Sequence, residues 1–120
     1  MALRPSGAFL STVLDLAKWD ALLYADTVLT ESERRQMTTQ VRLTDGSTYP
    51  YGFGWHVDNV RGQRRVWHGG GLPGFSAQFV RFPDAGVTII LLVNGDDVDT
   101  ASIANGLAAL HYLPRTNAGK

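Results

Sequence analysis

A glycine-rich stretch, Trp67 to Phe82, constrains the fold of this chain more than any other segment. It begins Trp-His-Gly-Gly-Gly, turns at Leu72-Pro73-Gly74, and continues as an alternating segment, Phe75 to Phe82. Glycine lets another molecule approach the main chain closely, and a glycine inside a strand often marks such an approach. Three glycines beside an imidazole therefore favour a bare strand edge kept clear for a ligand. The alternative is a glycine-rich hairpin entry with a surface histidine, and the residues alone support both interpretations equally.

Two helices are predicted before this stretch. The first spans Thr12 to Ala25, because a threonine is followed three residues later by an acid and then by apolar residues at helical spacing. The second spans Thr30 to Gln40 and begins with the same kind of capping pair, a threonine and a glutamate. Pro50 ends any helix before it.

After Pro50 the pattern changes to alternation with period two, which predicts antiparallel strands. The predicted strands are Tyr51–Val57, Arg64–His68, Phe75–Phe82 and Val87–Val93. The last of these is apolar on both faces, as is typical of a strand inside a sheet. The fold class predicted from this order is α+β, with two N-terminal helices, a three- to four-stranded antiparallel sheet and a C-terminal packing helix.

The C-terminal helix is predicted from Thr100 to Tyr112, and its apolar residues are Ile103, Leu107 and Leu110. We expect one core that joins the helices to the sheet. Its predicted members are Trp19, Leu23, Phe79, Ile89, Leu91 and Leu107. The chain of 120 residues is long enough for a single domain, residues 1–120, with a disordered tail at residues 115–120.

Composition excludes several classes of function. Eleven basic and eleven acidic residues give a net charge of zero, which offers no electrostatic case for binding nucleic acid. The longest apolar run, Val87–Val93, is too short to span a membrane. No metal site or other cofactor is predicted, because the three histidines lack metal-ligand spacing and the chain has no cysteine. Asp96, Asp97 and Asp99 are interpreted as acids that cap the following helix rather than as a calcium loop.

Five segments in a fixed order carry a family resemblance. They are Gly7–Trp19, Tyr51–Trp55, His68–Gly70, Gly74–Ser76 and Leu92–Asn94. Together they resemble the C-terminal third of the serine β-lactamase and penicillin-binding-protein-like family, in particular its class C β-lactamase and esterase branch. The resemblance covers residues 5 to 113 and implies part of a β-lactamase/transpeptidase-like fold.

The resemblance also implies roles for four residues. That family has a Lys-Thr-Gly motif, often replaced by His-x-Gly, on the strand that borders the active site. His68-Gly69-Gly70 matches this motif. The match implies that His68 lies near the nucleophile as an electrostatic or proton-relay group and that Gly71 donates its N–H to the oxyanion hole. Gly69 and Gly70 would bind the substrate.

Two other motifs of the family are missing from this chain. No serine has a lysine three residues later, and no Tyr-x-Asn sequence occurs. A nucleophile within reach of its base is the minimum for covalent catalysis. We therefore expect the C-terminal part of a serine hydrolase that cleaves an ester, amide or β-lactam in its intact parent but is inactive alone. The alternative is a non-catalytic ligand-binding or structural half-domain that associates with another chain.

The resemblance implies a partner as well. In the family, the strand that matches Val87–Val93 pairs with a strand from the N-terminal part of the fold. An apolar edge that lacks its neighbour recruits another strand. The expected partner is therefore the missing N-terminal portion or a second copy of this chain in a strand-paired homo-oligomer. The sequence does not indicate a cellular location.

Overall fold

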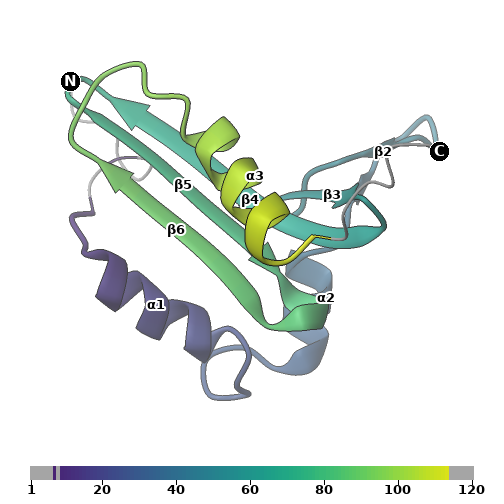
Figure 1. The fold of residues 1–120 in the computed structure, drawn as a ribbon. Coiled ribbons are helices and arrows are strands. Elements are labelled where there is room, and N and C mark those ends of the chain that lie inside the picture. Colours follow the sequence, from purple (N-terminus) through teal and green to yellow (C-terminus); the bar gives the residue numbers. More distant parts are fainter. Residues whose placement is uncertain (1–6, 8, 114–120) are drawn as a thin grey trace, which may run out of the picture.

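The structure, a computed structural model, describes residues 7 and 9–113 as an antiparallel sheet with helices on both of its faces (Figure 1). The predicted disordered tail at residues 115–120 lies outside the described residues. Among those described, no helix has the length and apolar character needed to cross a bilayer. In chain order the elements are α1 (Val13–Leu22), α2 (Glu31–Met37), β1 (Val41–Arg42), β2 (Thr48–Tyr49), β3 (His56–Val60), β4 (Gln63–Leu72), β5 (Phe75–Phe82), the 3₁₀ helix η1 (Pro83–Ala85), β6 (Val87–Val93) and α3 (Thr100–His111).

The main sheet confirms the predicted α+β class. Its four strands run in the order β3-β4-β5-β6, and every neighbouring pair is antiparallel. β5 and β6 have the predicted bounds, and β4 continues through all three glycines to Leu72. β1 and β2 form a separate small hairpin, which the sequence did not predict.

The prediction of a strand from Tyr51 to Val57 was wrong over most of its length. β3 begins only at His56, and Tyr51 contributes an isolated bridge to that residue. The segment between them turns back on itself, because the N–H of Gly52 donates to the carbonyl oxygen of Trp55 at 2.7 Å. A Cβ at residue 52 would lie 2.2 Å from the carbonyl oxygen of Met37, so glycine lets the turn pack against the end of α2.

Capping chemistry starts both N-terminal helices as the sequence predicts. The Thr12 hydroxyl accepts a hydrogen bond from the N–H of Asp15, and Thr30 forms a complete capping box with Glu33. Each helix ends three residues earlier than predicted, at Leu22 and Met37. After α1 the chain continues in hydrogen-bonded turns, because the N–H groups of the next three residues bond to carbonyl oxygens three residues back.

The core on one face of the sheet, here called the α3 side, differs from the predicted core. Val80 and Phe82 of β5 pack there against Ala104, Ala108 and Leu113. The helix contacts the sheet through its alanines because small side chains allow a close approach. Two of the apolar residues of this helix lie outside the buried core, since Ile103 is 45% exposed and Leu110 is 80% exposed.

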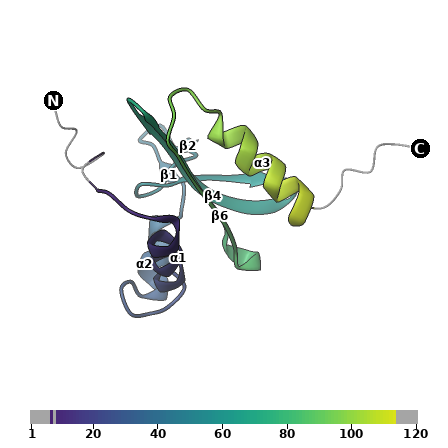
Figure 2. The ribbon, with the colours of Figure 1, turned by 60° about the vertical axis from the view of Figure 1, so that its left-hand side comes forward.

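The opposite face, the α1 side, carries a buried ion pair. The Arg81 guanidinium donates to the Asp20 carboxylate from Nε at 2.5 Å, and the Thr88 hydroxyl donates to the same carboxylate at 2.8 Å. Leu23 is buried on this side, but Trp19 is 42% exposed. Figure 2 views the sheet along its edge, with α3 on one side and α1 and α2 on the other.

The predicted single core was therefore wrong, because its members divide between two faces. Side chains alternate along a strand, so cross-strand neighbours share a face. Phe79 pairs with Ile90 on the α1 side, whereas Val80 pairs with Ile89 on the α3 side. Leu91 lies on the α3 side beside Gln78.

β6 lies at the edge of the sheet. It pairs with β5 along its full length, and no described strand pairs with its other side. Its apolar faces predict a central strand, but the described residues supply a neighbour on one side alone.

Candidate functional site

The glycine-rich half of β4 is an open edge. β3 pairs with β4 only as far as the His56–Trp67 register, so residues 68–72 have β5 as their one described neighbour. The β4–β5 hairpin closes with a two-residue loop, Pro73-Gly74, and Gly74 has the positive φ of 83° that such a turn needs. Residues that flank a two-residue loop form a hydrogen-bonded pair, and the pairs then alternate along the ladder.

This alternation fixes which main-chain groups face the open edge. Leu72 and Phe75 flank the loop, so Gly71 and Gly69 occupy positions whose N–H and C=O groups point away from β5. The structure thus places the four predicted site residues, His68, Gly69, Gly70 and Gly71, along one stretch of strand that has a described neighbour, β5, on one side alone. We call this stretch, residues 68–71, the glycine edge.

His68 is held at both ring nitrogens. Its Nδ1 lies 2.6 Å from the carbonyl oxygen of Gly69, and its Nε2 lies 3.0 Å from the hydroxyl oxygen of Tyr51. A carbonyl oxygen only accepts hydrogen bonds, so Nδ1 must carry the proton. In the neutral ring, Nε2 then accepts the hydrogen bond that the Tyr51 hydroxyl donates.

Tyr51 is the site residue that sequence reasoning missed. It lies at the start of the Tyr-Gly-Phe-Gly-Trp segment that contributed to the family resemblance, but no role followed from that segment. The turn after it, which replaces the predicted strand, places its ring edge-on to the His56 ring and its hydroxyl at His68.

His56 and Trp67 form the neighbouring layer on the α3 side. Their rings stack with centroids 4.3 Å apart, and the indole N–H donates to the Asp58 carboxylate at 3.1 Å. Burial by itself would raise the pKa of Asp58, but hydrogen bonds from Arg65 and Trp67, with the charges of Arg65 and His56, outweigh it and lower that pKa. Asp58 therefore stays ionised beside this ring pair.

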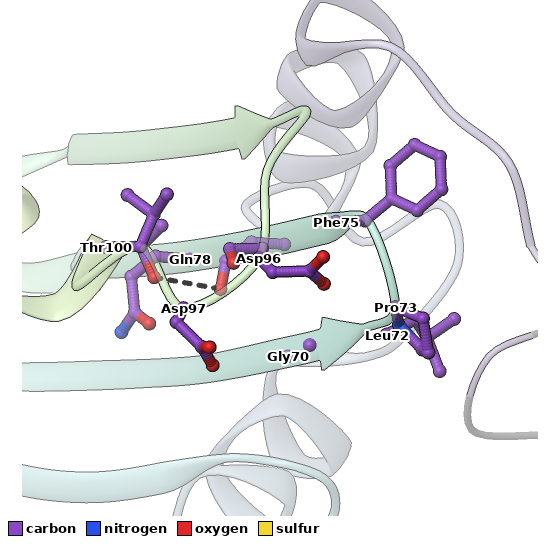
Figure 3. A pocket seen from close by; sticks show the side chains of 12 residues that line it. Gly70, Leu72, Pro73, Phe75, Gln78, Asp96, Asp97 and Thr100 are labelled. Carbon is purple, nitrogen blue, oxygen red and sulfur yellow. Dashed lines mark hydrogen bonds between the residues drawn. The ribbon is translucent and has the colours of Figure 1, made fainter.

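Two hollows flank the hairpin tip, one on each face of the sheet. The first, the α3-side hollow, has a volume of about 550 Å³ (Figure 3). Its lining residues include Gly70, Gly71, Gln78, Asp96, Asp97 and Thr100. The second, the α1-side hollow, has about 500 Å³ and is more apolar, with Phe9, Leu10, Phe75 and Leu92 in its walls. Both hollows contain Gly70 and Gly71, so the glycine edge separates them.

Ser76 is the serine nearest to the glycine edge in the sheet, since it pairs with Gly71. Its side chain is buried, with 8% exposure of the residue, and its hydroxyl donates to the carbonyl oxygen of Gly95 at 2.9 Å. A nucleophilic serine needs a base within hydrogen-bond reach. Ser76 instead faces a main-chain acceptor. Within residues 7 and 9–113, no cluster of three or more metal-binding side chains is found.

Comparison with known proteins gives matches along nearly the whole chain. A family model described as Beta-lactamase matches residues 1–113. Penicillin-binding protein 4* of Bacillus subtilis (strain 168) is 34% identical over 112 residues, which cover 92% of this chain and 25% of that protein. A D-aminopeptidase of Gluconobacter oxydans (strain 621H) is 25% identical over 100 residues, which cover 83% of this chain and 19% of that protein. The chain therefore spans a quarter or less of the length of these relatives.

Proposed function

The chain belongs to the β-lactamase family, and from this premise we propose that it supplies the C-terminal wall of a serine hydrolase active site. The observation that carries the proposal is the glycine edge, a stretch of β4 that pairs with β5 on one side and, among the described residues, presents main-chain N–H and C=O groups beside an imidazole on the other. A preorganised N–H at the oxygen of an acyl intermediate stabilises the transition state by about 3 kcal/mol.

In the proposed site, Gly71 donates its N–H to the oxyanion, because that N–H points away from β5. Gly69 presents its N–H to the ligand along the same edge, and Gly70, whose own polar groups face β5, lets the ligand approach the strand closely. His68 lies next to them and acts as an electrostatic or proton-relay group. The Tyr51 hydroxyl donates a hydrogen bond to its Nε2, so the phenol holds the imidazole in place and favours the Nδ1–H form.

By itself the chain is proposed to be inactive. It has no Ser-x-x-Lys and no Tyr-x-Asn, and the Ser76 hydroxyl is buried against a carbonyl oxygen. The nucleophile and its base then come from a segment that this chain does not contain. The substrate of the assembled enzyme is an ester, an amide or a β-lactam cleaved through an acyl-serine. The names of the two relatives favour the β-lactam and the amide.

The proposed partner binds at the open side of β6 and on the α1 side. β6 carries no charged residue, and charges are the usual protection of an exposed edge strand. Leu14 of α1 is 72% exposed and Phe75 of β5 is 60% exposed on the same side. The N-terminal portion of the fold would cover these groups, and without it a second copy of the chain would pair along β6.

The missing nucleophile equally favours a second candidate, a non-catalytic half-domain that keeps the glycine edge for binding or assembly. One experiment separates the two. The chain is tested alone, and also fused behind the N-terminal portion of Bacillus subtilis penicillin-binding protein 4*, with intact-mass detection of a β-lactam adduct and hydrolysis of a chromogenic β-lactam. We expect no adduct alone and an acyl-serine in the fusion.

Two histidine variants of the fusion provide the matched comparison. His68→Ala should lower the acylation rate by about 100-fold, the size of a general acid–base contribution, whereas His111→Ala, an exposed change in α3, should leave it unchanged. A cooperative thermal transition verifies folding of each variant. An adduct on Ser76 in the isolated chain, or a folded fusion that forms no acyl-serine, contradicts the proposal.

A further inference from the structure

Two stacked rings beside the glycine edge, those of His56 and Trp67, have no assigned part in the proposed hydrolase role. The two residues form the last cross-strand pair of β3 and β4, immediately before residue 68. Their ring planes are 18° apart, with centroids at 4.3 Å. We call these two residues the ring stack. It ends where the glycine edge begins, and the centroids of the His56 and His68 rings are 5.6 Å apart.

Polar groups fix the ring stack on the α3 side. The Trp67 indole N–H donates to the Asp58 carboxylate at 3.1 Å, and the Arg65 guanidinium donates to both oxygens of that carboxylate at 2.8 and 2.6 Å. Arg65 also donates to the side-chain oxygen of Asn105 in α3 at 2.8 Å. A bidentate pair of this kind specifies geometry as well as adding energy. The Trp67 ring is therefore held relative to both β3 and α3.

Tyr51 connects the ring stack to the site. Its ring meets the His56 ring edge-on, with centroids 4.7 Å apart and planes at 82°, and its hydroxyl oxygen lies 3.0 Å from Nε2 of His68. A main-chain bridge joins residues 51 and 56, which fixes the backbone of Tyr51 but not the rotation of its side chain. Because aromatic rings prefer the edge-to-face arrangement, the His56 ring favours the rotamer that brings the phenol to His68.

The contacts of His56 with Tyr51, Trp67 and His68 are ring contacts. A flat ring without nitrogen atoms could make the contacts with the tyrosine and the tryptophan equally well. An aliphatic side chain of similar size could fill the same space, but it would offer no aromatic surface. Substitutions at this position can therefore separate the shape of the ring from its nitrogen atoms and its charge.

We propose that His56 is a positioning residue for His68. It acts through Tyr51, because its ring holds the phenol where the hydroxyl donates to Nε2 of His68, and this hydrogen bond keeps His68 in the Nδ1–H form at the glycine edge. The consequence for catalysis rests on the proposed function. The consequence for the His68 ring is a property of the chain alone, so the two can be tested separately.

The first test is the tautomer of His68 in the full chain, read from ring ¹⁵N shifts at alkaline pH. His56→Ala removes the ring against which Tyr51 packs, so the Nε2–H population of His68 should rise to the level found in Tyr51→Phe. His56→Phe keeps a flat ring and should retain the Nδ1–H form. His56→Leu should behave like His56→Ala, and it decides the question if the alanine variant does not fold.

Two further variants show whether the effect is specific. Val60→Ala shortens a partly buried side chain of β3 that packs against the α3-side core, so it should lower stability without changing the His68 tautomer. His56→Ala added to Tyr51→Phe should cause no further change in the tautomer, because both residues act through one hydrogen bond.

The second test is the acylation rate of the fusion. A misplacement of about 1 Å can cost about 100-fold in rate, and we expect His56→Ala to slow acylation about tenfold without weakening the preceding non-covalent binding of the β-lactam. His56→Phe should restore the rate. Val60→Ala should leave it unchanged.

The outcomes separate this inference from the proposed function. An unchanged tautomer in the folded His56→Ala or His56→Leu variant overturns the inference. So does an equal change in His56→Phe, which would assign the effect to the ring nitrogen atoms, or in Val60→Ala, which would assign it to lost stability. A further change in the double variant overturns the route through Tyr51. If the tautomer responds as expected but the fusion forms no acyl-serine, the positioning of His68 is retained and the hydrolase role is rejected.

Discussion

The two faces of the sheet differ in how completely their apolar side chains are covered. On the α3 side, Val80 and Phe82 are sealed beneath the alanines of α3, at 2% and 1% exposure. On the α1 side, the helix is held by a buried ion pair, while large apolar residues beside it, such as Leu14 and Phe75, remain exposed. Large exposed apolar groups mark interaction surfaces. The α3 side has a closed core, whereas the α1 side leaves apolar side chains exposed, which is the surface where we propose that a partner binds.

The buried cluster of Asp20, Arg81 and Thr88 on the α1 side, here called the polar clamp, has a physical rationale. Arg81 is 3% exposed and lies over the Tyr24 ring at 4.6 Å from its centroid, so its position is defined by several groups at once. A buried ion pair adds little net stability compared with apolar packing, but it favours one geometry. The clamp can therefore fix the orientation of α1 on the sheet while the apolar surface around it stays available.

The largest expected change in the free energy of unfolding is on the α3 side. Phe82→Ala should lower the free energy of unfolding by about 3–5 kcal/mol, because it leaves a cavity in the sealed core. Phe75→Ala is the matched change on the open side of the same strand, where the ring is 60% exposed, and should cost less than about 1 kcal/mol. Denaturant unfolding measures both values. Equal losses would remove the distinction between the faces.

The next effect concerns the clamp. Asp20→Ala should lower the free energy of unfolding by about 3 kcal/mol, because the Arg81 guanidinium would be left buried without its carboxylate. Adding Arg81→Leu to that variant should restore most of the loss, since no unpaired charge remains. The measurement is chemical denaturation of the single and double variants, and a double variant less stable than Asp20→Ala would contradict this account of the clamp.

The smallest change in stability is expected when the hydrogen bond to His68 is removed. His68 lies on the α1 side with Phe79. Tyr51→Phe should cost about 1 kcal/mol or less, because it removes one partly exposed hydrogen bond. Its main consequence is spectroscopic. Ring ¹⁵N shifts should show the Nδ1–H form of His68 in the unmodified chain and a larger Nε2–H population in the variant.

Tyr49→Phe is the control, since this ring is 56% exposed and makes no contact with His68. An Nε2–H form as the main species of the unmodified chain would contradict the assigned tautomer.

Much of the fold could be predicted because its signals are local. Capping pairs at Thr12 and Thr30 start the helices, and Pro73-Gly74 closes the hairpin. The turn at Gly52 could not be predicted in the same way, because the aromatic alternation there indicates a strand and the turn depends on a carbonyl oxygen of Met37. The division of the core between two faces depends equally on tertiary packing, since alternation shows that two faces exist but not what covers each.

The candidate site also has a part that the sequence predicts and a part that only the folded structure brings together. His68 and the glycines adjoin in sequence, so a short pattern identifies them. Tyr51 lies 17 residues from His68, and Asp97 approaches Gly70 only because the loop after β6 folds over the hairpin tip. Neither contact follows from a periodic sequence pattern, because each depends on the register of the sheet.

The association state of the chain tests the incomplete α1 side and β6 edge most directly. Light scattering after size-exclusion chromatography at micromolar concentration should give a mass above that of the monomer, because residues 7 and 9–113 leave the β6 edge and its exposed neighbours without cover. Leu92→Lys, at a 42% exposed position of β6, should return the chain to a monomer, whereas Leu110→Lys, at an 80% exposed position of α3, should not. A monomer at all concentrations, unchanged by Leu92→Lys, would contradict the account.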